Sequence, residues 1–219
     1  MLFRSELVGP KGHVVGIDNS VKLLDVAAAR SAVQSQSQLR FIEGDVRHWR
    51  DDEPFDAIVG RLILFHLADP VSVLRHHAAA LRVGGLWLAL DFDLGAARAE
   101  PSLPWIDEAM GWVTAAFRQA GASPAIGTRL ALLLAEAGLV DVQGFGVQGY
   151  IAPGDPRGPA LLSGVLRTLA PQIAAAGLAT PQQIGIDTFE ARVADAVQFA
   201  GAVILPPTLV GAWGRRALV

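Results

Sequence analysis

The sequence predicts an α/β domain, with a mostly parallel sheet, helices on both of its faces and a helical lid insertion. Three observations lead to this prediction. Over residues 13–95, short apolar runs alternate with helical segments, and the first two of these runs end in an acid. After residue 95, helical patterns become more frequent. Strands that alternate with helices at this spacing form parallel sheets, because each crossover helix returns the chain to the same edge.

Four apolar runs in the first half of the chain have the length of strands. They comprise residues 13–18, 39–45, 55–60 and 86–91. A helix is expected over residues 20–33, with Ser20 as its N-cap. A second helix is expected from Asp69 to the glycine pair at 84–85, with Pro70 in the first helical position. The fourth run is continuously apolar, which is typical of a strand that is covered on both faces.

The second half contains more helix than strand. Helices are expected over residues 101–121, 128–138, 157–177 and 181–199, and strands over 139–151 and 203–213. Thr180, Pro181 and Gln183 form a capping-box pattern at the start of the last of these helices. The alternation of short strands with longer helices therefore ends near residue 95, where the insertion begins.

We expect the two parts of the chain to form one domain. Residues 1–95 make the α/β half that faces the ligand. Residues 96–219 contain a helical lid, at about 96–135 and 155–199, together with the last two strands, which complete the same sheet. Lids carry the residues that recognise a substrate, and they vary freely between proteins of one fold. The lid is therefore the part from which a substrate is hardest to infer.

Composition excludes several functional classes. Of the residues, 52% are hydrophobic and 18% are charged, and the net charge is −3, so no basic excess serves a nucleic acid or an anionic membrane. The uncharged window 196–214 is long enough to span a bilayer, but Pro206 and Pro207 would break a helix there. Cysteine is absent, which excludes disulfides, thiolate metal sites and thiol nucleophiles. We expect a cytoplasmic protein without nucleic-acid or membrane partners.

Two consecutive predicted strands end in the acids Asp18 and Asp45. In open parallel sheets, ligands bind beyond the carboxyl ends of the strands. A carboxylate at the first strand end can accept hydrogen bonds from both hydroxyls of a ribose, and one at the next strand end can accept from an exocyclic amine. Aspartate is also a common turn and cap residue. For Asp18 we favour the ribose role, and for Asp45 the two roles stay equally open.

Five stretches, in the same order and spacing, resemble the class I S-adenosylmethionine-dependent methyltransferases, in particular small-molecule methyltransferases of the ubiquinone/menaquinone-biosynthesis-like group. They are VVGIDNS (14–20), FIEGDV (41–46), FDAIVGR (55–61), FHLADP (65–70) and LRVGGL (81–86). The resemblance covers residues 5–93, and residues 203–216 look like the final strand of the family. It implies a Rossmann-like fold, S-adenosylmethionine as cofactor, and a small, apolar or aromatic metabolite as methyl acceptor.

The resemblance also implies roles for residues of the matching stretches. Asp18 would hold the ribose hydroxyls, with Asn19 and Ser20 beside the adenosine. Asp45 would accept from the adenine amine, with Val46 against the ring. These assignments apply only to positions that the family pattern matches.

Arg61, at the end of the third visible strand, would face the methionine part of the cofactor or the substrate.

The sequence departs from the family before Asp18. The family opens with a strand and a glycine-rich loop that cradles the methionine and the ribose. Here residues 2–8 look like the tail of the helix that follows that loop, and residues 9–12 look like the turn into the second strand. The central strand of the family's sheet is therefore expected to be missing.

Three explanations of this departure stay open. The start codon could be misassigned, the strands ending at Asp18 and Gly60 could pair directly, or a second chain could supply the strand, as in a homodimer. We favour the first for the native gene product and the second for this chain as given. A degenerate domain that binds a ligand or partner, or a natural-product cyclase, is the alternative to methyl transfer. A nicotinamide dehydrogenase is disfavoured, because the sequence shows no glycine-rich fingerprint for one.

Three polar residues are candidates for the chemistry. His66 lies just beyond a strand end and would serve as the base if the acceptor is a hydroxyl. Its other role would be to pack the short segment before Asp69, and this is slightly favoured. Asp91 and Asp93 end the fourth visible strand, where one of them could face the substrate. Solvation of a strand end is favoured for the pair over a metal site, and we expect no bound metal.

Aromatic residues of the second half are candidates for binding an apolar, flat substrate. Trp105 and Trp112 lie on the first helix of the insertion and do not share one strict face. Tyr150 is the single tyrosine of the chain and lies at a predicted strand end that faces the same insertion. Packing of the two tryptophans onto the sheet is at least as well supported by the pattern. We therefore predict a substrate-binding role for the three without excluding a structural one.

Overall fold

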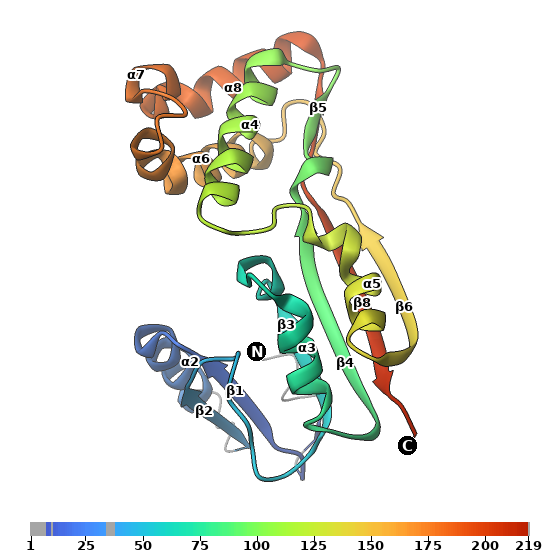
Figure 1. Ribbon diagram of the computed structural model, residues 1–219. Coiled ribbons are helices and arrows are strands. Elements are labelled where there is room, and N and C mark those ends of the chain that lie inside the picture. Colours follow the sequence, from blue (N-terminus) through green and yellow to red (C-terminus); the bar gives the residue numbers. More distant parts are fainter. Residues whose placement is uncertain (1–7, 10, 34–37, 219) are drawn as a thin grey trace. The chain divides into compact units, whose positions relative to one another are not determined.

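The computed structural model describes residues 8–9, 11–33 and 38–218. The chain divides into two compact units, Met1–Pro54 and Phe55–Val219 (Figure 1). The helix tail expected over residues 2–8 lies, apart from Val8, outside the described residues. Among the described residues, no helix has the length and apolar character needed to cross a membrane.

The first unit is a strand–helix–strand motif. Strand β1 (Val14–Asp18) runs parallel to β2 (Leu39–Glu43), and α2 (Val21–Val33) connects them. Helix α2 begins where the carbonyl oxygen of Ser20 accepts from the N–H of Leu24, at 3.1 Å. This unit has the parallel pairing that the alternation of strand and helix predicts.

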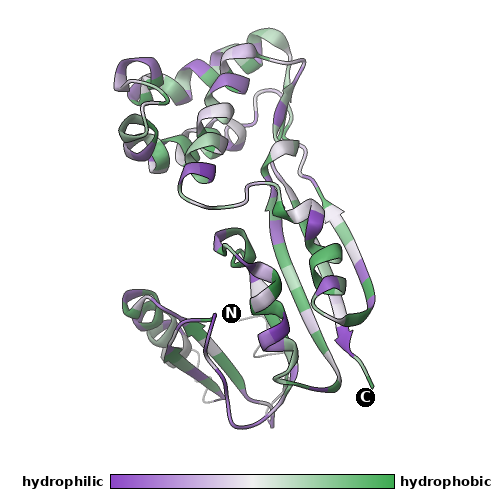
Figure 2. Cartoon of the chain, in the orientation of Figure 1, coloured by the Kyte–Doolittle hydropathy of each residue, from purple (hydrophilic) through white to green (hydrophobic). Residues whose placement is uncertain are grey.

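The second unit contains a four-stranded sheet. Its order is β3 (Phe55–Arg61), β4 (Leu81–Asp93), β8 (Thr208–Arg216) and β6 (Leu139–Val147). Strands β3 and β4 are parallel, whereas β8 runs antiparallel to both of its neighbours. Strand β4 is largely hydrophobic along its length (Figure 2). It is a central strand and packs against neighbours on both edges, as its continuously apolar sequence predicts.

Short helical elements cover the sheet and form the first hydrophobic core. They are η1 (Leu64–His66), α3 (Pro70–Ala78), η3 (Ile126–Arg129) and α5 (Leu130–Glu136). Asp69 caps α3 as predicted, because its Oδ1 accepts from the N–H of Ser72 at 3.0 Å. The largest fully buried members of this core are Leu64, Leu74, Leu81, Ile126, Leu130 and Leu134.

Four other helices have a hydrophobic core of their own; they lie in the segments expected to form the lid, and we call them the lid helices. They are α4 (Pro104–Gln119), α6 (Arg157–Ala175), α7 (Pro181–Ile184) and α8 (Ile186–Ala200). Buried members of this second core include Ile106, Val113, Leu166, Ile173, Ile184 and Val193. A two-stranded sheet of β5 (Arg98–Glu100) and β7 (Val203–Leu205), with the short helix η2 (Leu94–Ala96) before it, connects the lid to the four-stranded sheet.

Two expectations about the elements need correction, one for a helix and one for a strand. The helix expected over residues 181–199 is divided by Gly185, whose φ of 54° ends α7. The last strand is divided by the two prolines that follow β7. The fold class itself is confirmed.

The start of α7 offers a direct test of local capping. Thr180 accepts from the N–H of Gln183 at 3.2 Å, and the Gln183 side chain accepts from the N–H of Thr180 at 2.8 Å. We expect Thr180→Ala to lower the free energy of unfolding by about 1 kcal/mol, because an N–H group of the first turn loses its acceptor. Urea unfolding followed by circular dichroism measures this. Thr180→Ser keeps the hydroxyl and should match the wild type, and an equal loss in both variants would contradict the capping role.

Candidate functional site

The carboxyl ends of β1 and β2 lie together at one edge of the first unit. Asp18 is in register with Glu43, and the N–H of Gly44 donates to the carbonyl oxygen of Asp18 at 3.0 Å. Asp45 follows directly after Gly44. The structure therefore places the two predicted acids at the same edge, as parallel strands of matched length require.

The two carboxylate oxygens of Asp18 have different surroundings. Its Oδ1 accepts from the N–H of Ser20 at 2.9 Å, which closes the turn into α2. No described residue donates to its Oδ2. Asn19 is exposed, and Asp18 and Ser20 are half-buried. The turn role and the ligand role are therefore compatible, because one oxygen serves the turn and the other can accept from a bound molecule.

Asp45 has a strong local partner. The Nε and Nη2 atoms of Arg47 donate to its two carboxylate oxygens at 2.5–3.0 Å, and the N–H of Arg47 donates to Oδ1 at 2.9 Å. These hydrogen bonds lower the pKa of Asp45 to about 2. Asp155 and Arg157 repeat the geometry, and the pKa of Asp155 is likewise about 2. The recurrence shows that the Asp-x-Arg spacing itself forms this pair, so Asp45 would accept from a ligand only with its remaining lone pairs.

In the second unit, the residues after β3 turn sharply. Arg61 ends the strand with an exposed side chain. Leu62 has a φ of 54°, a conformation that is uncommon for a residue other than glycine, and its N–H donates to the carbonyl oxygen of Leu90 at 2.8 Å. Residues held in this conformation often cluster at binding sites, because the surrounding contacts must maintain them. The turn directs the chain into η1, which ends at His66.

Asp91 is buried beneath this turn, with a relative exposure of 0%. Its Oδ2 accepts from the N–H of Phe65 at 3.3 Å, whereas its Oδ1 is buried and has no hydrogen-bond partner among the described residues. Burial raises the pKa of Asp91 to about 6, although backbone N–H groups of η1 oppose this shift. The expected solvation of this strand end is wrong for Asp91. The reason is tertiary: η1 and η3 both pack on the end of β4, which the isolated strand pattern does not reveal.

His66 directly follows Phe65, and Asp93 lies two residues after Asp91 on β4. His66 is exposed, and its ring contacts the edge of Phe65 at a centroid distance of 5.0 Å. Asp93 is half-buried, and its Oδ1 caps η2 by accepting from the N–H of Gly95 at 3.0 Å. In the described part of the chain, no group of three histidine or acidic residues could hold a metal ion.

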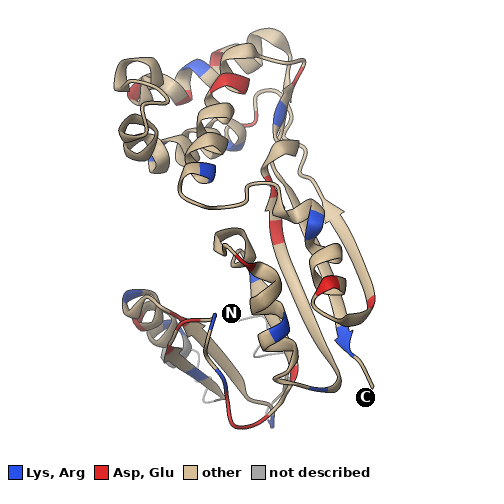
Figure 3. Cartoon of the chain, in the orientation of Figure 1, with Lys and Arg blue, Asp and Glu red and all other residues tan. Residues whose placement is uncertain are grey.

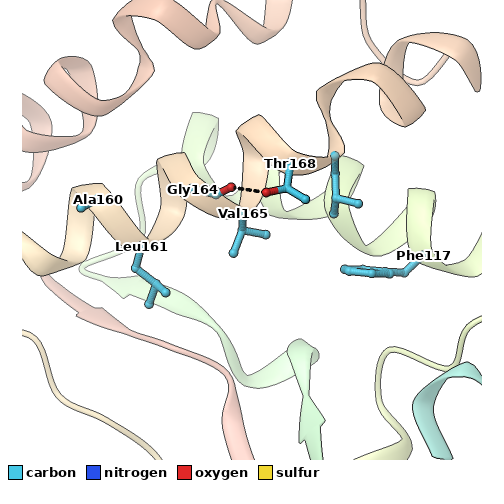
Figure 4. A pocket seen from close by; sticks show the side chains of 7 residues that line it. Phe117, Ala160, Leu161, Gly164, Val165 and Thr168 are labelled. Carbon is cyan, nitrogen blue, oxygen red and sulfur yellow. Dashed lines mark hydrogen bonds between the residues drawn. The ribbon is translucent and has the colours of Figure 1, made fainter. Parts of the chain in front are cut away.

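Phe65 connects η1 to the lid. Its ring contacts that of Phe117 on α4 at a centroid distance of 4.9 Å, and its carbonyl oxygen accepts from the N–H of Ser123 at 2.9 Å. Next to Phe117 there is an open pocket of about 480 Å³, which we call the α4–α6 pocket (Figure 4). It is lined by Phe117, Ala160, Leu161, Gly164, Val165, Thr168 and Leu169.

The predicted aromatic residues lie elsewhere. Trp105 is covered by the guanidinium group of Arg192, 4.9 Å from its ring, and lines a second open pocket of about 470 Å³ together with the fully exposed Phe199. Trp112 packs against the lid core, and Tyr150 is 69% exposed. The structure does not bring these three together, and none of them lines the α4–α6 pocket.

The residues that the sequence reasoning missed form a second apolar face on α6. Leu161, Val165 and Leu169 recur every four residues, and Gly164 lies on the same side. The buried face of the same helix uses other positions, such as Leu162 and Leu166. Apolar residues on two faces of one lid helix are the signal that could have revealed this pocket.

Comparison with known proteins identifies the family to which the chain belongs. A family model described as a methyltransferase domain matches residues 1–121, which is more than half of the 219-residue chain. The chain belongs to the methyltransferase-domain family. The match extends from the first unit through β3, β4 and the whole of α4, so the family assignment includes both the Asp18 edge and η1.

Similar methyltransferase proteins differ in what their names say they methylate. The demethylmenaquinone methyltransferase of Staphylococcus epidermidis is 31% identical over 101 residues, which are 46% of this chain and 39% of that protein. The trans-aconitate 2-methyltransferase of Klebsiella pneumoniae is 36% identical over 76 residues, 35% of this chain and 28% of that protein. Each match thus spans well under half of the relative. The structure of YcgJ from Bacillus subtilis is similar in fold, with a TM-score of 0.57, 16% identity and coverage of 94% of this chain and 83% of that one.

Proposed function

We propose that the chain is a methyltransferase that transfers a methyl group from S-adenosylmethionine to a small, apolar or aromatic metabolite. The observation that carries this proposal is the carboxylate of Asp18, which ends β1 within the stretch matched by the family model. One of its oxygens remains available to a ribose hydroxyl. The matches to named methyltransferases over 76 to 101 residues support the reaction type.

The residues of the first unit fit the adenosine part of this cofactor. Asp18 would accept from the ribose, with Asn19 and Ser20 beside the nucleoside at the start of α2. Asp45 would accept from the adenine amine with the lone pairs that Arg47 leaves, and Val46 would lie against the ring. In this proposal residues 1–95 hold the cofactor, and residues 96–219 form the lid and complete the sheet.

Methyl transfer requires little from the protein beyond positioning of the acceptor. S-adenosylmethionine, held by Asp18 and its neighbours, would supply a methyl group that is already activated by the attached sulfonium. The chain's part is to align the acceptor and exclude water. His66 would take the proton that a hydroxyl acceptor gives up. Arg61 would face the methionine part of the cofactor or the acceptor, Asp93 would contact the acceptor, and the buried Asp91 would support η1 from behind.

Calorimetry with S-adenosylmethionine tests the cofactor site. We expect Asp18→Asn to weaken binding about 10- to 100-fold, because a charge-assisted hydrogen bond contributes about 1.5–3 kcal/mol. The asparagine oxygen can still accept from the N–H of Ser20, so the turn into α2 is kept. Asp25→Asn, on the exposed surface of the same helix, is the matched control and should bind like the wild type.

Two results would contradict the proposal. The first is a wild-type chain that does not bind S-adenosylmethionine, and the second is equal binding by wild type and Asp18→Asn. Binding without methyl transfer to any of a panel of phenols, quinols and amines would favour a ligand-binding module over an enzyme.

A further inference from the structure

Helix α6 has more apolar surface than its own core uses. One face packs into the lid core through Leu162, Leu166 and Ile173, which are all buried. Next to this face lie Leu161, Val165 and Leu169; the last two are partly buried against the same core, and Leu161 is 41% exposed. The apolar surface of α6 therefore extends beyond the core onto a strip that a ligand can reach.

This strip is hollowed, and its chemistry is uniform. With Phe117 it lines the α4–α6 pocket, an open depression of about 480 Å³. None of the lining side chains is charged. Thr168 is the one polar side chain among them, and its Oγ1 donates to the carbonyl oxygen of Gly164 at 2.9 Å (Figure 4). The hydroxyl hydrogen is therefore already used within the helix, and no lining side chain is left to donate to a ligand.

The pocket also adjoins the candidate reaction site. Phe117 is shared between the pocket and the contact with Phe65, and Phe65 directly precedes His66. A molecule in the α4–α6 pocket would thus lie one aromatic ring away from η1. Lys, Arg, Asp and Glu are scattered over the unit that holds this pocket, without a cationic stripe (Figure 3).

We propose that the α4–α6 pocket binds the uncharged ring or hydrocarbon chain of the methyl acceptor. A carboxylate placed here would meet no cation and no side-chain donor, so nothing would offset the hydration that it loses on contact with the apolar lining. The pocket therefore selects apolar acceptors and rejects di- and tricarboxylates. Naming the ligand as the acceptor rests on the proposed function; the binding of apolar molecules at this place does not.

Gly164 provides a sharp test. A Cβ at this position would meet no heavy atom within 4 Å, so a leucine side chain would project into the pocket without disturbing the helix. The probe is N-phenyl-1-naphthylamine, an uncharged dye whose fluorescence rises in apolar sites, titrated into the full chain without cofactor. We expect Gly164→Leu to weaken dye binding at least 10-fold. Gly111→Leu is the control: Gly111 also lies mid-helix with no neighbour within 4 Å, but outside the pocket, and dye affinity should not change.

Three outcomes would overturn the proposal. They are equal dye binding by wild type and Gly164→Leu, displacement of the dye by trans-aconitate, and a dimer in sedimentation velocity that Gly164→Leu dissociates. The last would show that a second copy of the chain covers this face. Both substitutions replace a helical glycine with a residue that favours the helix, so loss of binding does not arise from unfolding. Failure of the proposed function would instead appear as absent S-adenosylmethionine binding, with dye binding unchanged.

Discussion

Gly127→Ala is expected to lower the free energy of unfolding by about 2–3 kcal/mol. Gly127 lies in η3, where a Cβ would come within 2.8 Å of the Asp93 nitrogen and the Phe92 carbonyl carbon. Both are backbone atoms of β4, so no side-chain rotation relieves the overlap and η3 must move away from the strand. That movement would loosen Ile126, which is buried in the first core. Urea unfolding followed by circular dichroism measures the loss.

Gly111→Ala is the matched control for this prediction. Its Cβ would meet nothing within 4 Å, and the residue lies in the middle of α4. Alanine favours a helix over glycine, so this variant should be unchanged or more stable by up to about 1 kcal/mol. Equal unfolding free energies for Gly127→Ala and the wild type would contradict the close approach of η3 to β4.

Asp91→Asn is expected to change how stability depends on pH. Burial raises the pKa of Asp91 from 3.8 to about 6, so the folded chain holds this proton more tightly than the unfolded chain. The stabilisation from this group is complete below about pH 4 and is lost as the pH rises through 6. The asparagine oxygen can still accept from the N–H of Phe65 but does not titrate. Relative to the variant, the wild type should lose about 2–3 kcal/mol between pH 4 and pH 7.5.

Thermal and urea unfolding of both proteins at several pH values between 4 and 7.5 measures this difference. The acids Asp45 and Asp155, whose pKa values are lowered to about 2, lose their stabilising pairs as the pH falls, which is the opposite direction. They are present in both proteins, so the difference between wild type and variant isolates Asp91. Parallel stability curves for the two proteins would contradict the buried titrating carboxyl.

Much of the local structure follows from the sequence because it depends on near neighbours. Asp69 with Pro70, and Thr180 with Gln183, start helices where predicted, since a cap involves residues at most three positions apart. Asp18 ends β1, and Asp45 lies two residues beyond the end of the neighbouring parallel strand β2; the alternation of strand and helix predicts this shared edge directly. The Asp45–Arg47 pair is just as local, and its Asp-x-Arg spacing could have been recognised.

The features that depend on distant segments were not predictable in the same way. Asp91 is buried because η1 and η3, about 26 and 35 residues away on either side, both pack on the end of β4. The α4–α6 pocket needs Phe117 and Leu161 together, from two helices joined by a long connection. Trp105 and Tyr150 looked suitable for a substrate by residue type, but their positions in the lid separate them from that pocket.

The sequence by itself determined the class of fold, the family and the strand edge at which Asp18 and Asp45 lie. These features depend on periodicity, caps and short motifs, which act over a few residues. Only the tertiary structure decided that Asp91 is buried rather than solvated, and that Leu161, Gly164 and Val165 line a pocket. Burial and pocket shape are sums over contacts between segments far apart in the chain, and no local pattern specifies which segments will meet.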